Sequence, residues 1–377
     1  MGGDAGADVG GDAGADVGGD AGADVGGDAG ADVGGDAVRF ARWDGAGSPF
    51  RVVSTALPAR LDAGEVLVEV ELATICGSDL HTVAGHRPTP TPTVLGHEQV
   101  GRVVAAAPGA QVRPGDRVVW SVTVSCGACP RCTGGLEHKC VRLRKFGHEP
   151  VAAGWTLSGG FATHAVLPAG TTIVPVPEDL PDVVAAPASC ATATVAAMLD
   201  AAPPLPGRRV LVTGAGLLGV TAAAMCATAG AEVTVSDPDP ARRRLATRFG
   251  ADRVAAPGEP LTGFDVALEL SGSATAVEGC LAALDVGGHA VLAGSVSPGP
   301  PVTIAPERFV RNLLTVTGVH NYRPGHLRRA VAFLTGHAGR FPFAELVGER
   351  FGLADLDRAF AAAGRSPALR QAVDPRR

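Results

Sequence analysis

The sequence has very few lysines and no concentrated stripe of bases. Lys139 and Lys145 are the only lysines, and the other side chains counted as Lys or Arg are all arginine. The net charge of −6 comes from the first 37 residues, which contain nine Asp and no base. Without them, 32 basic side chains face 29 acidic ones, so the rest of the chain is slightly positive. We therefore expect no nucleic-acid partner.

The sequence also lacks a convincing membrane segment. Residues 210–231 form a run of 22 residues without a charge, which is long enough to cross a bilayer. The run opens with a short strand-like segment and contains four glycines, so we assign it to a globular domain. The N-terminus has neither the basic region nor the apolar core of a secretory signal. We expect a cytoplasmic protein that does not bind membranes.

The N-terminal segment is a repeat of low complexity. Residues 2–33 are four copies of GGDAGADV, followed by a truncated GGDA. Gly, Ala and Asp bury too little apolar surface to offset the entropy lost on ordering, which predicts a disordered tail over residues 1–37. Regularly spaced Asp residues could bind calcium, but the period of eight differs from the nine of the calcium-binding β-roll repeat.

The remainder changes pattern part-way along, which predicts an α/β protein of two domains. Up to about residue 184 it is rich in strand-like runs, including Val66–Leu72, Val100–Ala106 and Val118–Val124. Four strand-like runs then alternate with Ala-rich helical stretches, as in parallel βαβ units: Val210–Thr213, Glu232–Ser236, Val266–Leu270 and Ala290–Leu292. From Leu327 we expect a helix, a short strand and an amphipathic helix over Leu356–Ala363.

A dinucleotide site is predicted where the first of these parallel strands ends. Val210–Thr213 runs directly into Gly214-Ala215-Gly216-Leu217-Leu218-Gly219, which opens a helix. In this context the first glycine allows a tight turn and the second lets the backbone approach the pyrophosphate. The third lets the helix pack closely on the strand. We place the phosphates on the helix N-terminus.

The end of the next strand indicates which dinucleotide is bound. Asp237 lies 23 residues after Gly214 and would accept hydrogen bonds from the adenosine ribose, which favours NAD over NADP. Arg242 and its neighbours could accommodate a 2′-phosphate, so NADP stays open. We also assign Ser271 and Ser295 to the cofactor site, together with Leu217 and Leu218 of the glycine loop.

Four cysteines on one loop predict a metal site. Their spacing is C-x2-C-x2-C-x7-C, and they are Cys126, Cys129, Cys132 and Cys140. Four thiolates at this spacing suit a closed tetrahedral zinc ion. An iron–sulfur cluster is the competing interpretation, since two-residue spacings also occur there.

Other candidate ligands are scattered along the chain. Cys76, the pair His97-Glu98, and Cys190 could form a catalytic zinc centre, which uses three protein ligands and leaves a position for water or substrate. Cys226 and Cys280 lie on expected helices, and we interpret them as apolar core residues.

Taken together, these motifs resemble the zinc-dependent medium-chain dehydrogenase/reductases, the alcohol dehydrogenase superfamily. Gly96 through Ala110 satisfies the signature GHExxGx5[GA]xx[IVSAC], with Ala107 at its Gly/Ala position, and residues 112–118 match the next turn. The four-cysteine loop, the glycine loop and the strand-terminal acid follow in the family's order. The resemblance runs from about residue 38 to the C-terminus.

The resemblance implies a fold and a set of roles. The fold would be a GroES-like, β-rich catalytic domain (residues 38–186 and 325–377) with a Rossmann domain of doubly wound parallel sheet (187–324). Cys76, His97 and Cys190 would bind the catalytic zinc, with Glu98 as an alternative ligand and Asp79 orienting His97. Ser78 and His81 would relay the proton, and Thr194 would contact the nicotinamide. Cys190 lacks the Gly-rich flank seen in plant and animal members.

The implied activity is hydride transfer between an alcohol and NAD, with two zinc ions per chain. Family members associate through the last strand of the cofactor domain, here about residues 314–318, so we expect a homodimer or homotetramer. A non-catalytic, zinc-stabilised NAD-binding protein and a dehydrogenase of formaldehyde-type thiol adducts are the alternatives.

The sequence leaves the substrate open among secondary alcohols, polyols or cyclitols, and hydroxyalkyl phosphonates. Leu180–Val195 resembles a branch of the family associated with phosphonate metabolism. Arg87, within the segment 86–93 expected to border the pocket, and the basic run 142–145 could hold an anion. They could equally be solvated surface charges.

Overall fold

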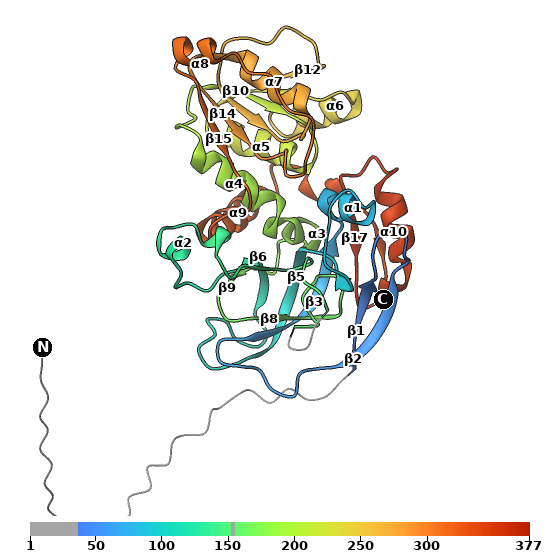
Figure 1. Cartoon of the computed structure of the whole chain (residues 1–377). Helices are drawn as coiled ribbons and strands as arrows, with labels where there is room; N and C mark the ends of the chain where they lie inside the picture. The colour runs from blue at the N-terminus through green and yellow to red at the C-terminus, as the bar shows by residue number, and fades with distance from the viewer. Residues whose placement is uncertain (1–36, 152–154) are drawn as a thin grey trace, which may run out of the picture.

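The computed structural model describes residues 37–151 and 155–377. The predicted N-terminal tail lies outside these residues except for Ala37, which begins the first strand. In Figure 1 the parallel-sheet domain, coloured yellow to orange, stands above the β-rich domain, and the C-terminal segment returns to the β-rich domain.

The upper domain is built on a six-stranded parallel sheet in the order β12-β11-β10-β13-β14-β15. Its strands are β10 (Arg209–Thr213), β11 (Glu232–Ser236), β12 (Arg253–Ala255), β13 (Phe264–Glu269), β14 (Leu284–Leu292) and β15 (Thr315–Gly318). Chain order reverses between β10 and β13, and a doubly wound sheet binds ligands beyond the strand ends at such a point. This confirms the Rossmann architecture expected from the sequence.

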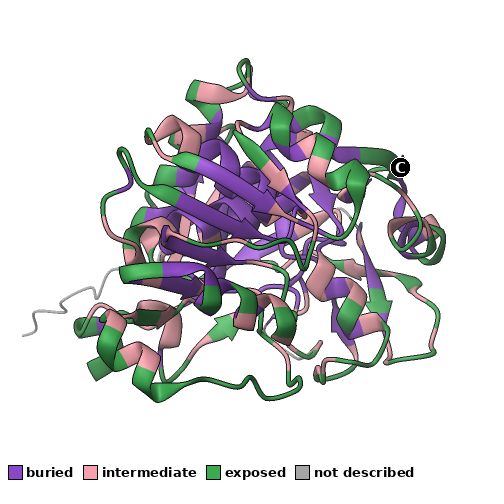
Figure 2. Ribbon diagram, turned by 90° about the horizontal axis from the view of Figure 1, so that it is seen from above, coloured by how far each residue is buried: buried purple, intermediate pink, exposed green. Residues whose placement is uncertain are grey.

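The helices of this domain flank the sheet, and Figure 2 shows buried strands between partly exposed helices. They are α4 (Ala191–Ala201), α5 (Leu217–Thr228), α6 (Pro240–Arg248), α7 (Ala274–Ala283) and α8 (Pro306–Asn312). Helix α5 is almost wholly apolar and mostly buried, which explains the long uncharged run: residues 210–231 form strand β10 and helix α5. Gly230, with φ of +81°, follows its C-cap in the left-handed conformation that suits glycine.

The lower domain is mainly antiparallel and confirms the GroES-like expectation. An eight-stranded sheet runs β16-β17-β3-β5-β6-β7, with β8 paired to β3 and β9 paired to β6. Its strands are β3 (Val66–Thr74), β5 (Glu98–Ala106), β6 (Arg117–Val124), β7 (Arg144–Lys145), β8 (His164–Leu167), β9 (Thr171–Pro175), β16 (Val347–Phe351) and β17 (Arg370–Val373). A three-stranded sheet joins β2 (Arg51–Ala56), β1 (Ala37–Trp43) and β4 (Thr93–Val94).

Helices and 3-10 turns connect these strands. They are α1 (Gly77–Val83), α2 (Pro130–Thr133), α3 (Asp182–Ala185), α9 (Pro324–His337), α10 (Leu356–Ala363) and the 3-10 turns η1 (Glu137–Lys139), η2 (Ala186–Ser189), η3 (Phe343–Leu346) and η4 (Leu353–Asp355). The C-terminal helix, strand and amphipathic helix expected from Leu327 onward are α9, β16 and α10. Strand β17 was not predicted.

One apolar cluster extends from the parallel sheet into the β-rich domain. It includes Val212 of β10 and Val220 of α5, as well as Leu327 of α9 and Val119 of β6. Burying each such side chain contributes about 1.5–3 kcal/mol. The hydroxyl of Tyr322 also donates to the carbonyl of Ser189 and accepts from the amide of Val122, 3.2 Å away. Because this packing continues from one domain into the other, it does not mark where either domain ends. We propose the domain boundaries at residues 186/187 and 324/325.

Among the described residues, no single helix is both long and apolar enough to cross a membrane. One bent pair, Asp182–Ser189 with Ala191–Ala201, passes by length and composition alone.

Candidate active site and metal centres

Three predicted ligands from distant parts of the chain meet at one point. Cys76 caps helix α1, His97 directly precedes strand β5, and Cys190 caps helix α4. Their donor atoms all lie within 4.8 Å of one another, and Cys76 and His97 are buried. Two thiols and one imidazole at this spacing fit a single zinc ion with one position left free.

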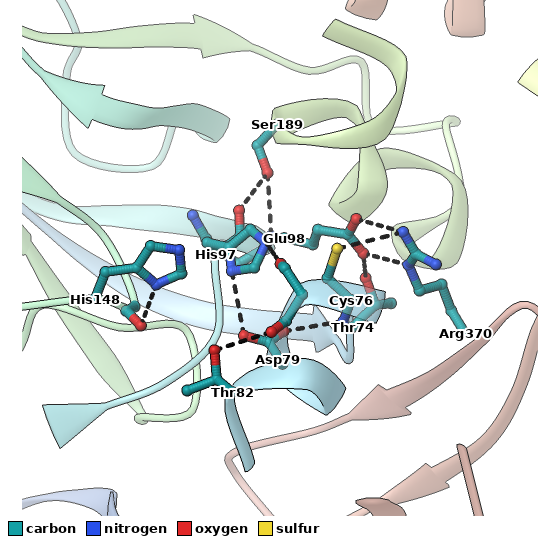
Figure 3. A network of polar contacts seen from close by, with 12 residues as sticks. Thr74, Cys76, Asp79, Thr82, His97, Glu98, His148, Ser189 and Arg370 are labelled. Atoms are coloured by element: carbon teal, nitrogen blue, oxygen red, sulfur yellow. Dashed lines mark hydrogen bonds and ion pairs between the residues drawn. The ribbon is translucent and has the colours of Figure 1, made fainter. Parts of the chain in front are cut away.

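Hydrogen bonds fix the orientation of this centre (Figure 3). Asp79 Oδ2 accepts from the amide of Cys76 at 2.9 Å, and Asp79 Oδ1 lies 3.3 Å from Nδ1 of His97. Burial opposes a charge on His97, but Asp79 and Cys76 together raise the pKa of this histidine well above its usual value. Asp79 thus holds His97 with Nε2 directed at the cluster, as a carboxylate does behind a ligating histidine. Ser78 Oγ lies 3.2 Å from that Nε2.

The four-cysteine loop has the geometry of a closed metal site. Its sulfur atoms also lie within 4.8 Å of one another. Neighbouring sulfurs are separated by 3.4 Å (Cys129–Cys132 and Cys126–Cys140), 3.9 Å (Cys129–Cys140) and 4.0 Å (Cys126–Cys132). A tetrahedron with Zn–S bonds of about 2.3 Å has edges of about 3.8 Å, so these distances suit one ion rather than a multi-iron cluster.

The surroundings of this loop favour the thiolate at Cys126 and Cys129, whereas burial and the neighbouring thiols raise the pKa of Cys132 to about 12. The amide of Ala128, the Arg142 side chain and the amide of Cys129 lower the pKa of Cys126 to about 5. Zinc binds the thiolate form. Cys226 and Cys280, by contrast, are buried in α5 and α7, where burial raises the pKa of each to about 12. The four-cysteine loop therefore differs from these two residues because its sulfurs lie together and two of them are shifted toward the thiolate.

The glycine loop between β10 and α5 has the shape of a phosphate cradle. A Cβ on Gly219 would lie 1.7 Å from the carbonyl oxygen of Gly214, so close packing excludes any side chain there. Gly214 has a φ of +91°, and its Cβ would lie 3.0 Å from the backbone of Ser271. A Cβ on Gly216 would meet nothing within 4 Å. The loop is therefore tightly packed at its two ends and open at the middle glycine, where a pyrophosphate would approach.

The other predicted cofactor residues differ in burial and in their hydrogen-bond partners. Asp237 is buried at the end of β11, where its carboxylate accepts from the amides of Ala215 (2.7 Å) and Asp239 (2.8 Å). Arg242 is exposed, 3.9 Å from Asp239. Ser271 donates to Glu269 at 2.7 Å. Leu217 is buried, Leu218 packs at the edge of the core, and Ser295 lines a cavity of about 860 Å³ between the domains.

Comparison with known proteins decides the family. Residues 62–178 match the alcohol dehydrogenase GroES-like domain, and residues 218–336 match the zinc-binding dehydrogenase domain. The chain is 38% identical over 258 residues to an L-threonine 3-dehydrogenase of Anaeromyxobacter dehalogenans, covering 63% of this chain and 70% of the relative. The chain belongs to the zinc-dependent alcohol dehydrogenase superfamily.

Solved structures of this superfamily share the fold. An alcohol dehydrogenase of Thermotoga maritima superposes with a TM-score of 0.84 at 26% identity, covering 90% of this chain and all of that one. A zinc-binding dehydrogenase of Sinorhizobium meliloti bound to NADP gives a TM-score of 0.81 at 26% identity and the same coverage. The chain is therefore an oxidoreductase of this type, whereas the relatives differ in substrate.

Glu98 has a partner that sequence reasoning missed. Arg370 on β17 donates from Nε to Glu98 Oε2 at 2.8 Å and from Nη2 to Oε1 at 2.9 Å, while Thr74 donates to Oε2 at 2.7 Å (Figure 3). Burial raises the pKa of Glu98 to about 7 against the opposing charge of Arg370. Arg370 Nη2 also lies 3.5 Å from Cys76 Sγ. Glu98 is thus held in an ion pair beside the centre and lies outside the group of three donor atoms.

The remaining predicted residues lie at the margins of this dehydrogenase site. Thr194 is one helical turn after Cys190, and its amide donates to the carbonyl of Cys190 at 3.0 Å. His81 is exposed at the end of α1, with its ring 6.0 Å from that of His86. Within the part of the chain that the structure describes, no hydrogen bond joins His81 to Ser78. His148, which the sequence did not single out, packs edge-to-face on His97 with ring centroids 5.1 Å apart.

Proposed function

We propose that this protein is a zinc-dependent alcohol dehydrogenase that transfers a hydride between the carbinol carbon of an alcohol and NAD. The observation that carries the proposal is the convergence of Cys76, His97 and Cys190 in a buried cluster that offers three metal ligands. Four protein ligands would fill the zinc coordination and leave no position for substrate. Three protein ligands leave the fourth position open to it. The dinucleotide loop belongs to the same chain.

A zinc ion held by these three residues supplies the Lewis acidity that lowers the pKa of a substrate hydroxyl. The protein provides position and proton transfer. Asp79 fixes His97, and Arg370 restrains both Glu98 and the sulfur of Cys76. Ser78, beside His97 Nε2, would accept the hydroxyl proton, and the ribose hydroxyls of the cofactor would carry it on to His81 and solvent. Thr194 and the glycine loop would hold the nicotinamide cofactor with its ring against the reacting carbon.

We further propose two zinc ions per chain, one catalytic and one held by the four-cysteine loop. Elemental analysis of the purified protein tests this directly. We expect two zinc ions per chain, and a chain that contains iron or no metal would overturn the assignment.

Asp237 supports NAD rather than NADP as the cofactor, although the Sinorhizobium meliloti relative was solved with NADP. On binding, its carboxylate would exchange backbone amides for ribose hydroxyls and would repel a 2′-phosphate. Asp237→Ala should raise the KM for NAD by roughly tenfold, which corresponds to the loss of one charged hydrogen bond. It should also reduce the preference for NAD over NADP. An unchanged ratio of the two kcat/KM values would remove Asp237 from this role.

We propose a homo-oligomer formed along the free edge of the parallel sheet. Strand β15 is the last strand of that sheet, and exposed apolar residues lie on it and just before it: Val310, Leu313 and Val316. Separately, we propose that the protein is cytoplasmic.

The deciding experiment is a substrate panel read by NADH absorbance at 340 nm on the zinc-loaded protein. Secondary alcohols, polyols, cyclitols and hydroxyalkyl phosphonates form the panel, with and without added thiols. Turnover of any simple member supports the proposal. Turnover only with formaldehyde and a thiol would indicate a thiol-adduct dehydrogenase, and NAD binding without turnover would indicate a non-catalytic protein.

A further inference from the structure

The only two lysines of the chain lie in one region of the fold. Lys139 ends the turn η1, and Lys145 ends the short strand β7. Nζ of Lys139 lies 2.8 Å from Nδ1 of His320, which follows β15 in the other domain. Lys139 and His320 line the same interdomain cavity as the predicted cofactor residue Ser295.

A third cation reaches this region from a separate loop. Arg87 lies on the segment before β4, which is tied to the segment after β7 by two contacts. The hydroxyl of Thr93 donates to the carbonyl of Glu149 at 2.6 Å, and the amide of Val151 donates to the carbonyl of Pro92 at 2.6 Å. Lys145 and Arg87 are close enough that the charge of Arg87, after burial, lowers the pKa of Lys145. We call Arg87, Lys139 and Lys145 the cation cluster.

The cation cluster has one acid beside it, Glu149, and no ion pair among the described residues. Across residues 37–151 and 155–377, none of its three members forms an ion pair. The Glu149 carboxylate accepts from the backbone amide of Lys145 at 2.8 Å, and its charge raises the pKa of Lys145 by less than either Arg87 or Lys139 lowers it. Asp200, which also lines the cavity, is already paired with Arg323, His326 and Arg329. Three half-buried cations beside one acid leave a net positive field, which favours a bound anion.

The cluster borders the proposed catalytic centre. The amide of His148 donates to the carbonyl of Lys145 at 3.2 Å, and the ring of His148 packs against the ligand His97. His148 therefore links the reacting centre to the backbone of Lys145 (Figure 3 shows His148 beside His97).

We propose that Arg87, Lys139 and Lys145 form a subsite for an anionic group on the substrate, while its hydroxyl lies at the Cys76–His97–Cys190 centre. This inference rests on the proposed function and names its substrate class: an alcohol that carries a phosphonate, phosphate or carboxylate. The cluster repels an ammonium group as strongly as it attracts an anion. L-threonine, which carries both, is therefore a poor substrate.

Four alcohols of similar size test the inference: 2-hydroxypropylphosphonate, 3-hydroxybutyrate, 2-butanol and L-threonine. The two anions should exceed 2-butanol in kcat/KM, and L-threonine should not. Arg87→Gln and Lys145→Gln should each lower kcat/KM for the better anion by about tenfold to a hundredfold, through KM, as expected for a charged hydrogen bond. The KM for NAD and the turnover of 2-butanol should stay within about twofold, which also reports correct folding. The larger effect, on phosphonate or on carboxylate, identifies the anion.

Arg144→Gln is the matched control. Arg144 precedes Lys145 on the same strand, but its guanidinium lies over the ring of Trp155, 4.7 Å from the centroid. Adjacent strand residues point to opposite faces, so this substitution removes a nearby charge without touching the cleft. If Arg144→Gln and Lys145→Gln lower kcat/KM for the anion equally, the effect depends only on net charge. That result would overturn the subsite.

Binding measured without turnover separates this inference from the proposed function. Methylphosphonate and acetate are titrated calorimetrically into the zinc-loaded protein with NADH, for the wild type and for Arg87→Gln/Lys145→Gln. Binding by the wild type that is lost in the double variant supports the subsite, even if no alcohol is oxidised. Turnover of neutral alcohols with no anion binding, or with equal losses for 2-butanol and the anions, overturns the subsite and leaves the dehydrogenase assignment intact.

Discussion

The two metal centres of this protein are assembled in opposite ways. The four-cysteine site takes all its ligands from residues 126–140, and two of its sulfurs are half-exposed. The Cys76–His97–Cys190 centre draws its ligands from two domains and is enclosed by Asp79, Glu98 and Arg370. The first needs only a local loop, whereas the second exists only once the whole fold has formed. A local site suits stability, and a dispersed one suits a reaction in the cleft between domains.

The largest expected difference between the centres is in turnover. Cys76→Ser removes one of three catalytic ligands, so kcat/KM should fall by about a thousandfold or more, since the metal supplies several kcal/mol of transition-state stabilisation. The Tm should change little, and the metal content should fall from two zinc ions to one. Retained activity would place the reaction elsewhere.

The ion pair behind the catalytic centre should matter next. Arg370→Met leaves Glu98 buried without its cation, which costs about 3–5 kcal/mol of stability. It also loosens Cys76, so kcat/KM should fall by about tenfold to a hundredfold. The double variant Glu98→Gln/Arg370→Met should recover much of the Tm, measured by calorimetry, because no unpaired charge remains. Independent, additive losses would show that the two side chains do not act as a pair.

A change at the four-cysteine site should have the reverse profile. Cys132→Ser should release one zinc ion and lower the Tm by roughly 5–10 °C, because a structural metal contributes folding free energy. The kcat of the folded fraction should stay within about twofold. A large fall in kcat at unchanged Tm would show that the four-cysteine site takes part in catalysis, as the other centre does.

The smallest effect is expected from the repeat outside both centres. Deletion of residues 2–36 should leave the Tm, zinc content and kcat/KM unchanged, as measured side by side with the full chain. A loss of activity would assign the repeat a part in the enzyme.

What could be predicted from the sequence follows the same contrast. The four cysteines lie within one short stretch of sequence, and so do the residues of the glycine loop. The spacing of each motif therefore predicted its ligand without knowledge of the fold. Cys76, His97 and Cys190 could be grouped only through the resemblance to a family. Arg370 was missed because it lies 272 residues from Glu98 on a four-residue strand, and no local pattern marks a buried arginine. Of the basic run 142–145, only the structure separates Lys145, which lies near Arg87, from Arg142 beside Cys126 and Arg144 over Trp155.

The position of Tyr322 gives the molecule a built-in reporter. It is the only tyrosine, and its hydroxyl joins the turn before Cys190 to strand β6 of the other domain. A single 13C label on tyrosine would therefore yield one nuclear magnetic resonance signal, located at the joint between the domains. Closure of the cleft around a nicotinamide cofactor would register in that signal without any foreign probe.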